Sequence, residues 1–317
     1  MEFDPDAPKP ERFLNYLNQL LEPEDIVTLQ EYLGYCLLPS TKGQKMLVIS
    51  GKGGEGKSVL GQILGGLWGE GLMYSSIQKI ATDRFARATL VDRLVMVDDD
   101  MSLDALPQTH VLKTLITLTG RTDVEQKGIQ SYQAVLYARF LGFTNGSISA
   151  LYDKSYGFYR RLILLKTKDR PADREDYPQL AEAILYDEKP GILLWLLEGL
   201  DRFFANGFKF TISKQAQKNL EDAMGEADPI SAFLDSQGYF TYDPQGRVTS
   251  ADLYEVYKQY CQDNLAHCVN DITFQKRVRD PLMQRGAIPS NAIPNRSRKQ
   301  VRGYHGIRLN MPPGWVA

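Results

Sequence analysis

The chain has 317 residues, of which 43% are hydrophobic and 24% are charged, and its formal net charge is −2. This composition is ordinary for a globular protein with room for about two domains, and it excludes a disordered tail, a collagen and a disulfide-rich miniprotein. The sequence also has few cysteines, an acidic and proline-rich start, and no apolar run long enough to cross a membrane. We therefore expect a cytoplasmic protein with no membrane partner.

The small net charge hides an uneven distribution along the chain. Residues 1–35 carry eight acids against Lys9 and Arg12, whereas residues 273–310 carry nine Lys and Arg against Asp280 alone. A positive excess of this size attracts a polyanion such as DNA, because neutralised phosphates release their condensed counterions. The alternative is a solvated basic face that balances the acidic N-terminus, and charge alone does not separate the two.

The first half of the chain predicts an α/β core. Apolar residues at helical spacing predict two short helices joined at Glu22-Pro23, which form an N-terminal helical segment over 1–40. From 41 to 170, buried strands alternate with helices, and this is typical of a mainly parallel sheet covered on both faces. The predicted strands are 45–50, 90–97, 136–144 and 160–166, with a helix over 57–67.

The second half predicts helices followed by a basic domain. Two helical stretches form a helical segment over 171–238, and the composition shifts after Gly238. A turn or hairpin, two helices and short strands then give the outline of a winged-helix-like domain over 239–317. The expected elements are helices over 178–205 and 213–236, a turn or hairpin over 239–248, helices from Thr249 and from near Asp271, and strands at 300–301 and 306–309.

A glycine-rich motif follows the first predicted strand. GKGGEGKS at 51–58 matches the phosphate-binding pattern G-x-x-x-x-G-K-[ST], and it stands between a strand and a helix as this motif requires. The glycines let backbone N–H groups converge on phosphates, the lysine adds a positive charge, and the serine can ligate Mg²⁺. The sequence therefore predicts a P-loop that binds ATP and Mg²⁺. Its expected residues are Gly51, Gly53, Gly54, Glu55, Gly56, Lys57, Ser58 and Val59.

An acidic turn supplies the second part of a triphosphatase site. A predicted strand runs into Asp98-Asp99-Asp100. One carboxylate can hold Mg²⁺ through water, together with Ser58, and the next can polarise the attacking water. We favour Asp98 and Asp99 for these tasks, because the apolar run ends at Val97.

These motifs, taken in order, resemble a known group of proteins. LQEYLGYCLLPSTKGQKMLVISGKGGEGKS at 29–58 and DRFARATLVDRLVMVDDDM at 83–101 are similar to the corresponding stretches of superfamily three helicases of the AAA+ class. The similarity is to the phage and plasmid primase–helicases related to the poxvirus primase–helicase, and it covers nearly the whole chain.

The resemblance implies an AAA+ P-loop ATPase core and an ATP-dependent DNA helicase. Such a protein would replicate a phage, a plasmid or another mobile element in the cytoplasm of a bacterial host. It would form a homo-oligomer, a hexameric ring that hydrolyses ATP at subunit interfaces and holds single-stranded DNA in its pore. The primase half of these proteins is absent from the sequence, so we expect a helicase-only protein or a fragment that works with a separate primase or polymerase.

The resemblance also assigns roles to individual residues. Within LKTLITLTGRTDVEQKGIQSYQAVLYARFLGFTNG, Lys127 would lie on a hairpin that faces DNA, and Asn145 would be the sensor of the γ-phosphate. GFYRRLILL resembles the arginine-finger segment, so Arg160 or Arg161, with Arg161 preferred, would reach the nucleotide of the neighbouring subunit. Glu55 stands where the family often has Asn, and we expect its carboxylate to point outward or to be offset. The DNA contacts expected in the C-terminal domain are Arg296, Arg298, Lys299 and Arg302.

Two other functions fit parts of this pattern. One is a nucleotide-controlled DNA-binding replication initiator with little or no unwinding, in which the winged domain does the work and nucleotide only orders the oligomer. The other is a small-molecule P-loop kinase, which gives no reason for the basic C-terminal stretch. Strand displacement on forked DNA separates the helicase from the initiator.

Overall fold

The computed structural model describes residues 3–101, 109–146, 156–171, 177–227, 229–236, 238–264, 268–295 and 297–310. The chain divides into two compact units, Met1–Ala223 and Met224–Ala317. Among the described helices, none combines the length and the hydropathy needed to span a bilayer.

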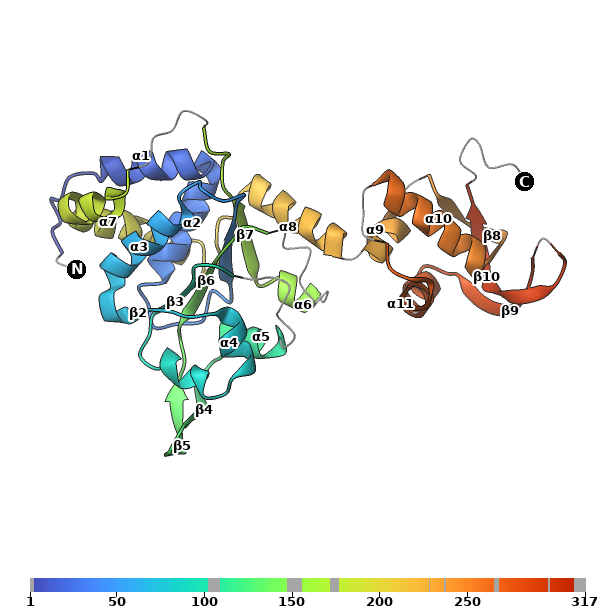
Figure 1. Ribbon diagram of the computed structural model, residues 1–317, viewed down its shortest axis with the longest axis horizontal. Helices are drawn as coiled ribbons and strands as arrows, with labels where there is room; N and C mark the ends of the chain where they lie inside the picture. Colours follow the sequence, from blue (N-terminus) through green and yellow to red (C-terminus); the bar gives the residue numbers. More distant parts are fainter. Residues whose placement is uncertain are drawn as a thin grey trace. The chain divides into compact units, whose positions relative to one another are not determined.

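The first unit is built on a five-stranded sheet (Figure 1). Its strands are β1 (Met46–Ser50), β2 (Leu72–Tyr74), β3 (Val95–Asp98), β6 (Arg139–Thr144) and β7 (Leu162–Lys166). Their order in the sheet is β2-β3-β6-β1-β7, and all neighbours are parallel. The predicted α/β fold with a parallel sheet is confirmed. The four predicted strands are present and shorter than predicted, β3 ends one residue later than predicted, and β2 is an additional strand of three residues.

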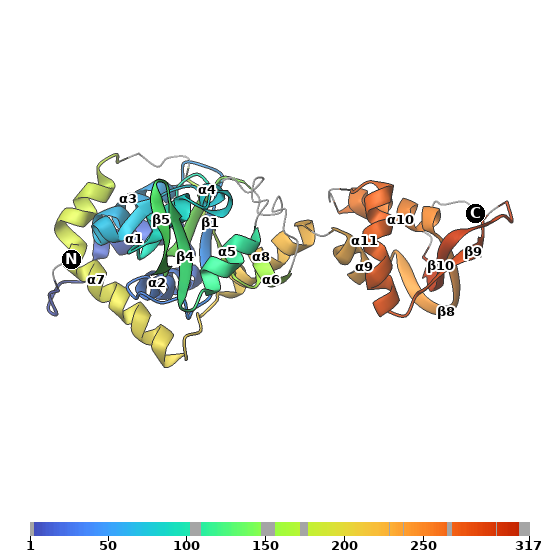
Figure 2. The same ribbon diagram turned by 90° about the horizontal axis from the view of Figure 1, so that it is seen from below.

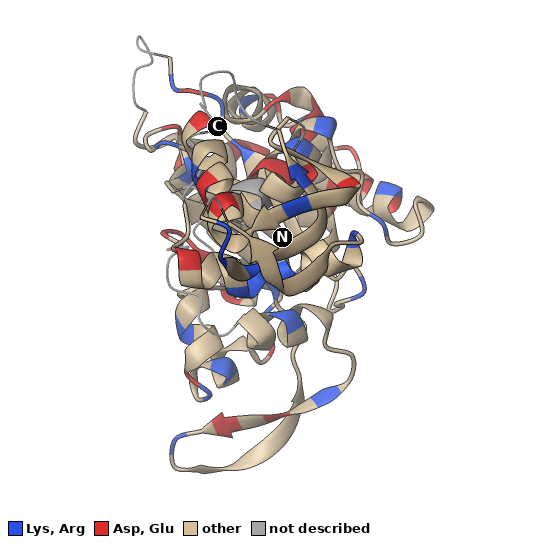
Figure 3. Cartoon of the chain, turned by 90° about the vertical axis from the view of Figure 1, so that its right-hand side faces the viewer, with Lys and Arg blue, Asp and Glu red and all other residues tan. Residues whose placement is uncertain are grey.

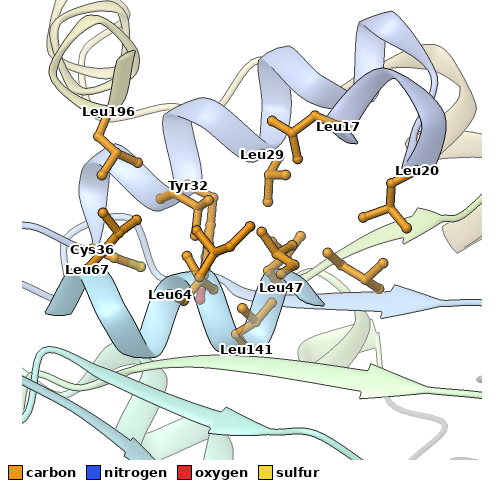
Figure 4. Packing of buried hydrophobic residues seen from close by; sticks show 14 of the residues in the cluster. Leu17, Leu20, Leu29, Tyr32, Cys36, Leu47, Leu64, Leu67, Leu141 and Leu196 are labelled. Carbon is orange, nitrogen blue, oxygen red and sulfur yellow. The ribbon is translucent and has the colours of Figure 1, made fainter. Parts of the chain in front are cut away.

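Four helices cover one face of this sheet: α1 (Glu11–Leu20), α2 (Pro23–Tyr35), α3 (Lys57–Trp68) and α7 (Leu180–Ala205). Their apolar side chains share one core with alternate strand residues such as Leu47 and Leu141, since successive strand residues point to opposite faces (Figure 4). The break between α1 and α2 lies at the predicted place, because Pro23 is the first residue of α2.

The chain up to Ala227 contains further helices, the last of which continues beyond the end of the first unit at Ala223. They are α4 (Ile77–Thr82), α5 (Thr109–Thr117), α6 (Tyr156–Tyr159), α8 (Lys214–Ala227) and the 3₁₀ turns η1 (Gly69–Gly71) and η2 (Ala86–Leu90). An antiparallel hairpin of β4 (Arg121–Gln126) and β5 (Ile129–Val135) lies below the sheet in Figure 1 and faces the viewer in Figure 2. In Figure 3 this hairpin contains both basic and acidic residues.

Helices α2 and α7 cross at very short range because each contributes a glycine. A Cβ at Gly34 of α2 would lie 2.6 Å from the backbone nitrogen of Leu200, and one at Gly199 of α7 would lie 2.6 Å from the carbonyl carbon of Gln30. A side chain at either position would therefore push the helix backbones apart. The Gln30 side chain spans the same crossing and donates to the carbonyl of Trp195 at 2.6 Å.

The second unit packs helices on a three-stranded antiparallel sheet. Its elements are α9 (Pro229–Asp235), β8 (Phe240–Thr249), α10 (Ser250–Asp263), α11 (Asp271–Gln284), β9 (Ile288–Pro294) and β10 (Gln300–Leu309), with strand order β8-β10-β9. The apolar sides of these elements share one core. Thr249 caps α10 and Asn270 caps α11, so both predicted helix starts are confirmed.

Two predictions for this part of the chain are wrong. The helix predicted over 213–236 is two helices, α8 and α9, and α9 begins at Pro229, which suits the first turn of a helix. Residues 239–248 do not form a hairpin of their own. They lie mostly in the single strand β8, which pairs with β10 on both sides of residues 243–246 and so accommodates the turn-forming residues as a local irregularity.

Candidate functional site

The glycine-rich loop joins the end of β1 to the start of α3. Gly53, Gly54 and Gly56 have φ values of 107°, 81° and 111°, which side chains with a Cβ rarely adopt, so the loop needs glycine at these positions. The first helical residue is Lys57, and Ser58 is exposed in the first turn. Val59 is partly buried against the core behind the loop.

Buried partners hold the loop from behind. The Tyr16 hydroxyl on α1 donates to the carbonyl of Gly56 at 2.9 Å, and the Gly51 N–H donates to the carbonyl of Thr144 at 3.0 Å. Tyr16 is 3% exposed. The N-terminal helix therefore supports the loop directly.

Glu55 points into the loop, where it pairs with Lys57. Its Oε2 lies 2.8 Å from Lys57 Nζ, while its Oε1 accepts the N–H of Gly53 at 2.8 Å and also that of Lys52. Burial opposes the charge on Glu55, but the Lys57 ammonium and the backbone N–H groups outweigh it and lower the pKa of this carboxyl. The expectation that Glu55 points outward is wrong. The alternative expectation, that the negative charge of Glu55 is offset by a positive one, agrees with its contact with Lys57.

The aspartates after β3 have different surroundings. Asp98 is buried, and its Oδ2 accepts the N–H of Ile77 at the start of α4 at 2.7 Å. Burial raises the pKa of Asp98 above its ordinary value. Asp99 is exposed, and its Oδ1 lies 3.5 Å from where a Cβ of Gly61 would stand on α3. Gly61 shares a helix face with Ser58, three residues earlier, so Asp99 lies beside the serine face of α3.

Strands β6 and β7, which flank β1 in the sheet, place further polar groups at the edge where the glycine-rich loop lies. Asn145 follows β6, and its Oδ1 lies 3.9 Å from where a Cβ of Gly53 would stand. The segment after β7 brings two more side chains to the loop. Thr167 Oγ1 lies 2.5 Å from where a Cβ of Gly51 would stand, and Arg170 Nη1 lies 3.6 Å from where a Cβ of Gly54 would stand. Sequence reasoning missed Thr167 and Arg170. The available signal was their position, since the carboxyl ends of neighbouring parallel strands meet at one edge.

This donor set fits a triphosphate with Mg²⁺. It offers N–H groups at the start of α3, the Lys57 ammonium, the Ser58 hydroxyl and the Asp99 carboxylate. Within the part of the chain that the structure describes, no group of three His, Cys, Asp or Glu residues forms a metal site. Mg²⁺ beside a nucleotide usually keeps several waters and takes phosphate oxygens as ligands, so it needs only one or two protein ligands.

Arg160 and Arg161 lie at the opposite end of the sheet. Leu162, the first residue of β7, pairs with Met46 at the start of β1, whereas the glycine-rich loop follows the end of β1. A five-residue strand spans roughly 15 Å, so neither arginine serves the loop of its own chain. Their surroundings differ. Arg161 folds back to donate to the carbonyl of Gly157, whereas Arg160 is exposed.

The predicted DNA contacts lie on two surfaces. Lys127 is in the turn of the β4–β5 hairpin, and its Nζ lies 5.8 Å from the centre of the Phe85 ring. In the second unit Arg302 lines two adjoining grooves of about 440 and 650 Å³, between the starts of α10 and α11 and the β9–β10 hairpin. Arg298 and Lys299 lie in the exposed turn of that hairpin. Arg296 lies outside the described residues.

Comparison with known proteins gives a family match and a fold match. A family described as "family of unknown function (DUF5906)" matches residues 49–161, about a third of the chain. Among curated proteins, none matches this sequence. The structure entitled "The apo structure of NrS-1 C terminal region (305-718)" is similar with a TM-score of 0.62 and 15% identity, over 96% of this chain and 77% of that chain. "The A form apo structure of NrS-1 C terminal region-CTR" has a TM-score of 0.60 and 14% identity, with coverages of 96% and 78%. At these identities the likeness shows the fold alone.

Proposed function

We propose that this protein is an ATP-dependent DNA translocase of the superfamily three helicase type, with an AAA+ P-loop core, which acts in the replication of a phage, plasmid or other mobile element. The glycine-rich loop carries the proposal, because its N–H groups, Lys57 and Ser58 gather at the start of α3 beside Asp99. The sequence resemblance to the primase–helicases and the fold likeness over 96% of the chain support it.

The side chains of this site have complementary tasks. Lys57 and the loop N–H groups hold the β- and γ-phosphates, Ser58 and an aspartate hold Mg²⁺, which offsets charge on the phosphates, and Asn145 orients the γ-phosphate or the attacking water. Because β6 lies between β1 and β3, Asn145 stands between the loop and the aspartates, which is where a group that contacts both would be needed.

The test of the nucleotide site uses two lysines of one loop. Lys57→Ala should lower DNA-stimulated ATP hydrolysis by at least about a hundredfold, as expected for loss of a preorganised charge at the phosphates. Lys52→Ala is the matched control, because its Nζ contacts the exposed Asp169 at 2.8 Å outside the loop. Full turnover by folded Lys57→Ala protein refutes the site.

Hydrolysis at a subunit interface requires a cation from the adjoining copy. Arg160 suits this task better than Arg161, because its side chain is exposed whereas Arg161 is tied to Gly157. A mixture of Arg160→Ala and Lys57→Ala subunits should regain part of the activity, since each supplies what the other lacks. Absence of rescue at every mixing ratio refutes an arginine that acts in trans. The assembly that we propose is a homo-oligomeric, hexameric ring with single-stranded DNA in its pore.

The second unit favours one further candidate function. It has its own core. The groove of about 440 Å³, which Arg279 and Arg302 line without an acidic residue, and the β9–β10 hairpin suit duplex DNA in the manner of a winged-helix domain. A replication initiator that uses nucleotide only to order its oligomer would have the same features. ATP hydrolysis stimulated by single strands, without displacement of a labelled strand from forked DNA, would favour the initiator over the translocase.

A further inference from the structure

The position of Glu55 is not explained by nucleotide binding. Glu55 is 3% exposed and Lys57 is 7% exposed, so both charges lie inside the loop. Each carboxylate oxygen has a partner: Oε2 pairs with Lys57, and Oε1 accepts N–H groups of Gly53 and Lys52. A buried charge requires such compensation, and these three residues of the loop supply it to the carboxylate.

These partners are the groups that a bound phosphate would use. An ionised carboxylate and a phosphate are both anions that only accept hydrogen bonds, so they compete for the same ammonium and the same N–H groups. The contacts that lower the pKa of Glu55 keep it ionised at neutral pH. A triphosphate that approached Lys57 would therefore meet a like charge already in place.

We propose that Glu55 is a built-in competitor of phosphate, and that a triphosphate binds this loop only by displacing the carboxylate from Lys57. The inference rests on the proposed nucleotide site. The loop with Glu55 inward is a self-occupied state, and the apparent affinity for nucleotide is reduced by the fraction of molecules in that state. Removing the charge of Glu55 should consequently tighten binding rather than weaken it.

The alternative role for Glu55 is a brace that holds the loop in shape. Glu55→Gln separates the two roles, because its carbonyl can still accept the N–H groups of Gly53 and Lys52 while the charge that neutralises Lys57 is gone. A brace predicts equal or weaker nucleotide binding by this variant. A competitor predicts tighter binding.

The experiment measures equilibrium binding of a non-hydrolysable ATP analogue with Mg²⁺ to the full chain. We expect Glu55→Gln to bind at least about tenfold more tightly than the wild type, because a like charge within contact distance of the phosphates is removed. The matched control is Asp169→Asn, which removes an acid that is 75% exposed and paired with Lys52 outside the loop. Screening by water and salt should limit its effect to less than about threefold.

Glu55→Ala guards against an effect specific to the amide, and thermal melting of each variant checks that the loop change leaves the protein folded. Tighter binding by both Glu55 variants supports the proposal. Equal or weaker binding by folded Glu55→Gln and Glu55→Ala, with a wild type that binds, overturns the competitor and leaves the nucleotide site standing. Absence of binding by all of these proteins refutes the nucleotide site itself and the competitor with it.

Discussion

Gly199→Ala should destabilise the first unit, although alanine is the better helix former. The new Cβ would lie 2.6 Å from the Gln30 carbonyl carbon, whereas ordinary contacts begin near 3.4 Å. Helices α2 and α7 would therefore have to separate by nearly 1 Å, which forfeits a quarter to a half of the dispersion energy of the contacts between them. Overpacking of this kind costs about 3 kcal/mol, and the gain in helix propensity returns about 1 kcal/mol. We therefore expect the free energy of unfolding of the first unit to fall by about 2 kcal/mol.

Thermal unfolding monitored by calorimetry checks this value. For a unit of this size a loss of 2 kcal/mol corresponds to a fall of roughly 4–8 °C in Tm. Tyr186→Ala is the control on the same helix, because Tyr186 is 90% exposed and its replacement should change stability by less than about 0.5 kcal/mol. A Gly199→Ala protein as stable as the wild type would show that the crossing is looser than the geometry indicates.

The glycine on the partner helix extends the same test. Gly34→Ala should also destabilise, since its Cβ would lie 2.6 Å from the backbone nitrogen of Leu200. The double variant with Gly199→Ala should cost less than the sum of the two single changes. Once the helices have moved apart for one methyl group, the second finds part of its space already open. Strict additivity would mean that the two glycines do not report on one crossing.

Three further predictions concern the site and the basic unit. Tyr16→Phe removes the hydroxyl that donates to Gly56, so it should cost about 1 kcal/mol in a denaturant titration and weaken nucleotide binding; an unchanged affinity would show that this contact does not shape the loop. Because burial raises the pKa of Asp98, its charge costs folded-state stability as pH rises through that pKa. Asp98→Asn should therefore be at least as stable as the wild type at neutral pH, with the difference vanishing below about pH 4, and a variant that is less stable at pH 7 contradicts this sign. Arg302→Ala should reduce the slope of log K against log salt for duplex DNA by about 1, whereas Arg308→Ala, whose guanidinium is paired with an aspartate, should reduce it less; equal slopes for both variants and the wild type would remove the grooves from the DNA interface.

The parallel sheet was predictable because its central strands are buried on both faces and read as continuous apolar runs. Strand β2 was missed because three residues, Leu72–Tyr74, give no periodicity to detect. Residues 239–248 predict a turn or hairpin because Asp243, Pro244 and Gly246 are turn-forming residues, but β8 forms because the segment pairs with a distant strand. Such pairing depends on β10, some sixty residues later, and no local pattern reports it.

The parts of the site whose backbone geometry is fixed by a motif were predictable from the sequence. The directions of individual side chains, which depend on their rotamers, were less predictable. Gly53, Gly54 and Gly56 predict the loop itself, since their positive φ values are ones that other residues rarely adopt. The direction of the Glu55 side chain depends on whether its carboxylate is better solvated by water or by the loop. Lys57 and the N–H groups of Lys52 and Gly53 contact the carboxylate in the loop, so it points inward. Arg160 and Arg161 are adjacent in sequence, so composition cannot separate them. Their surroundings do, because Arg161 donates to the carbonyl of Gly157 whereas Arg160 is exposed.

The strand order adds what the order of motifs along the chain cannot. The sequence places the acidic turn after the loop and Asn145 last, with no indication of which strands are neighbours. In the sheet β6 lies between β1 and β3, so the residue that comes last in the chain stands between the other two parts of the site. Strand β6 also follows the β4–β5 hairpin directly in the chain, so it joins Asn145 to the hairpin that carries Lys127. This is a short covalent path from the proposed hydrolysis site to Lys127, the residue proposed to contact DNA.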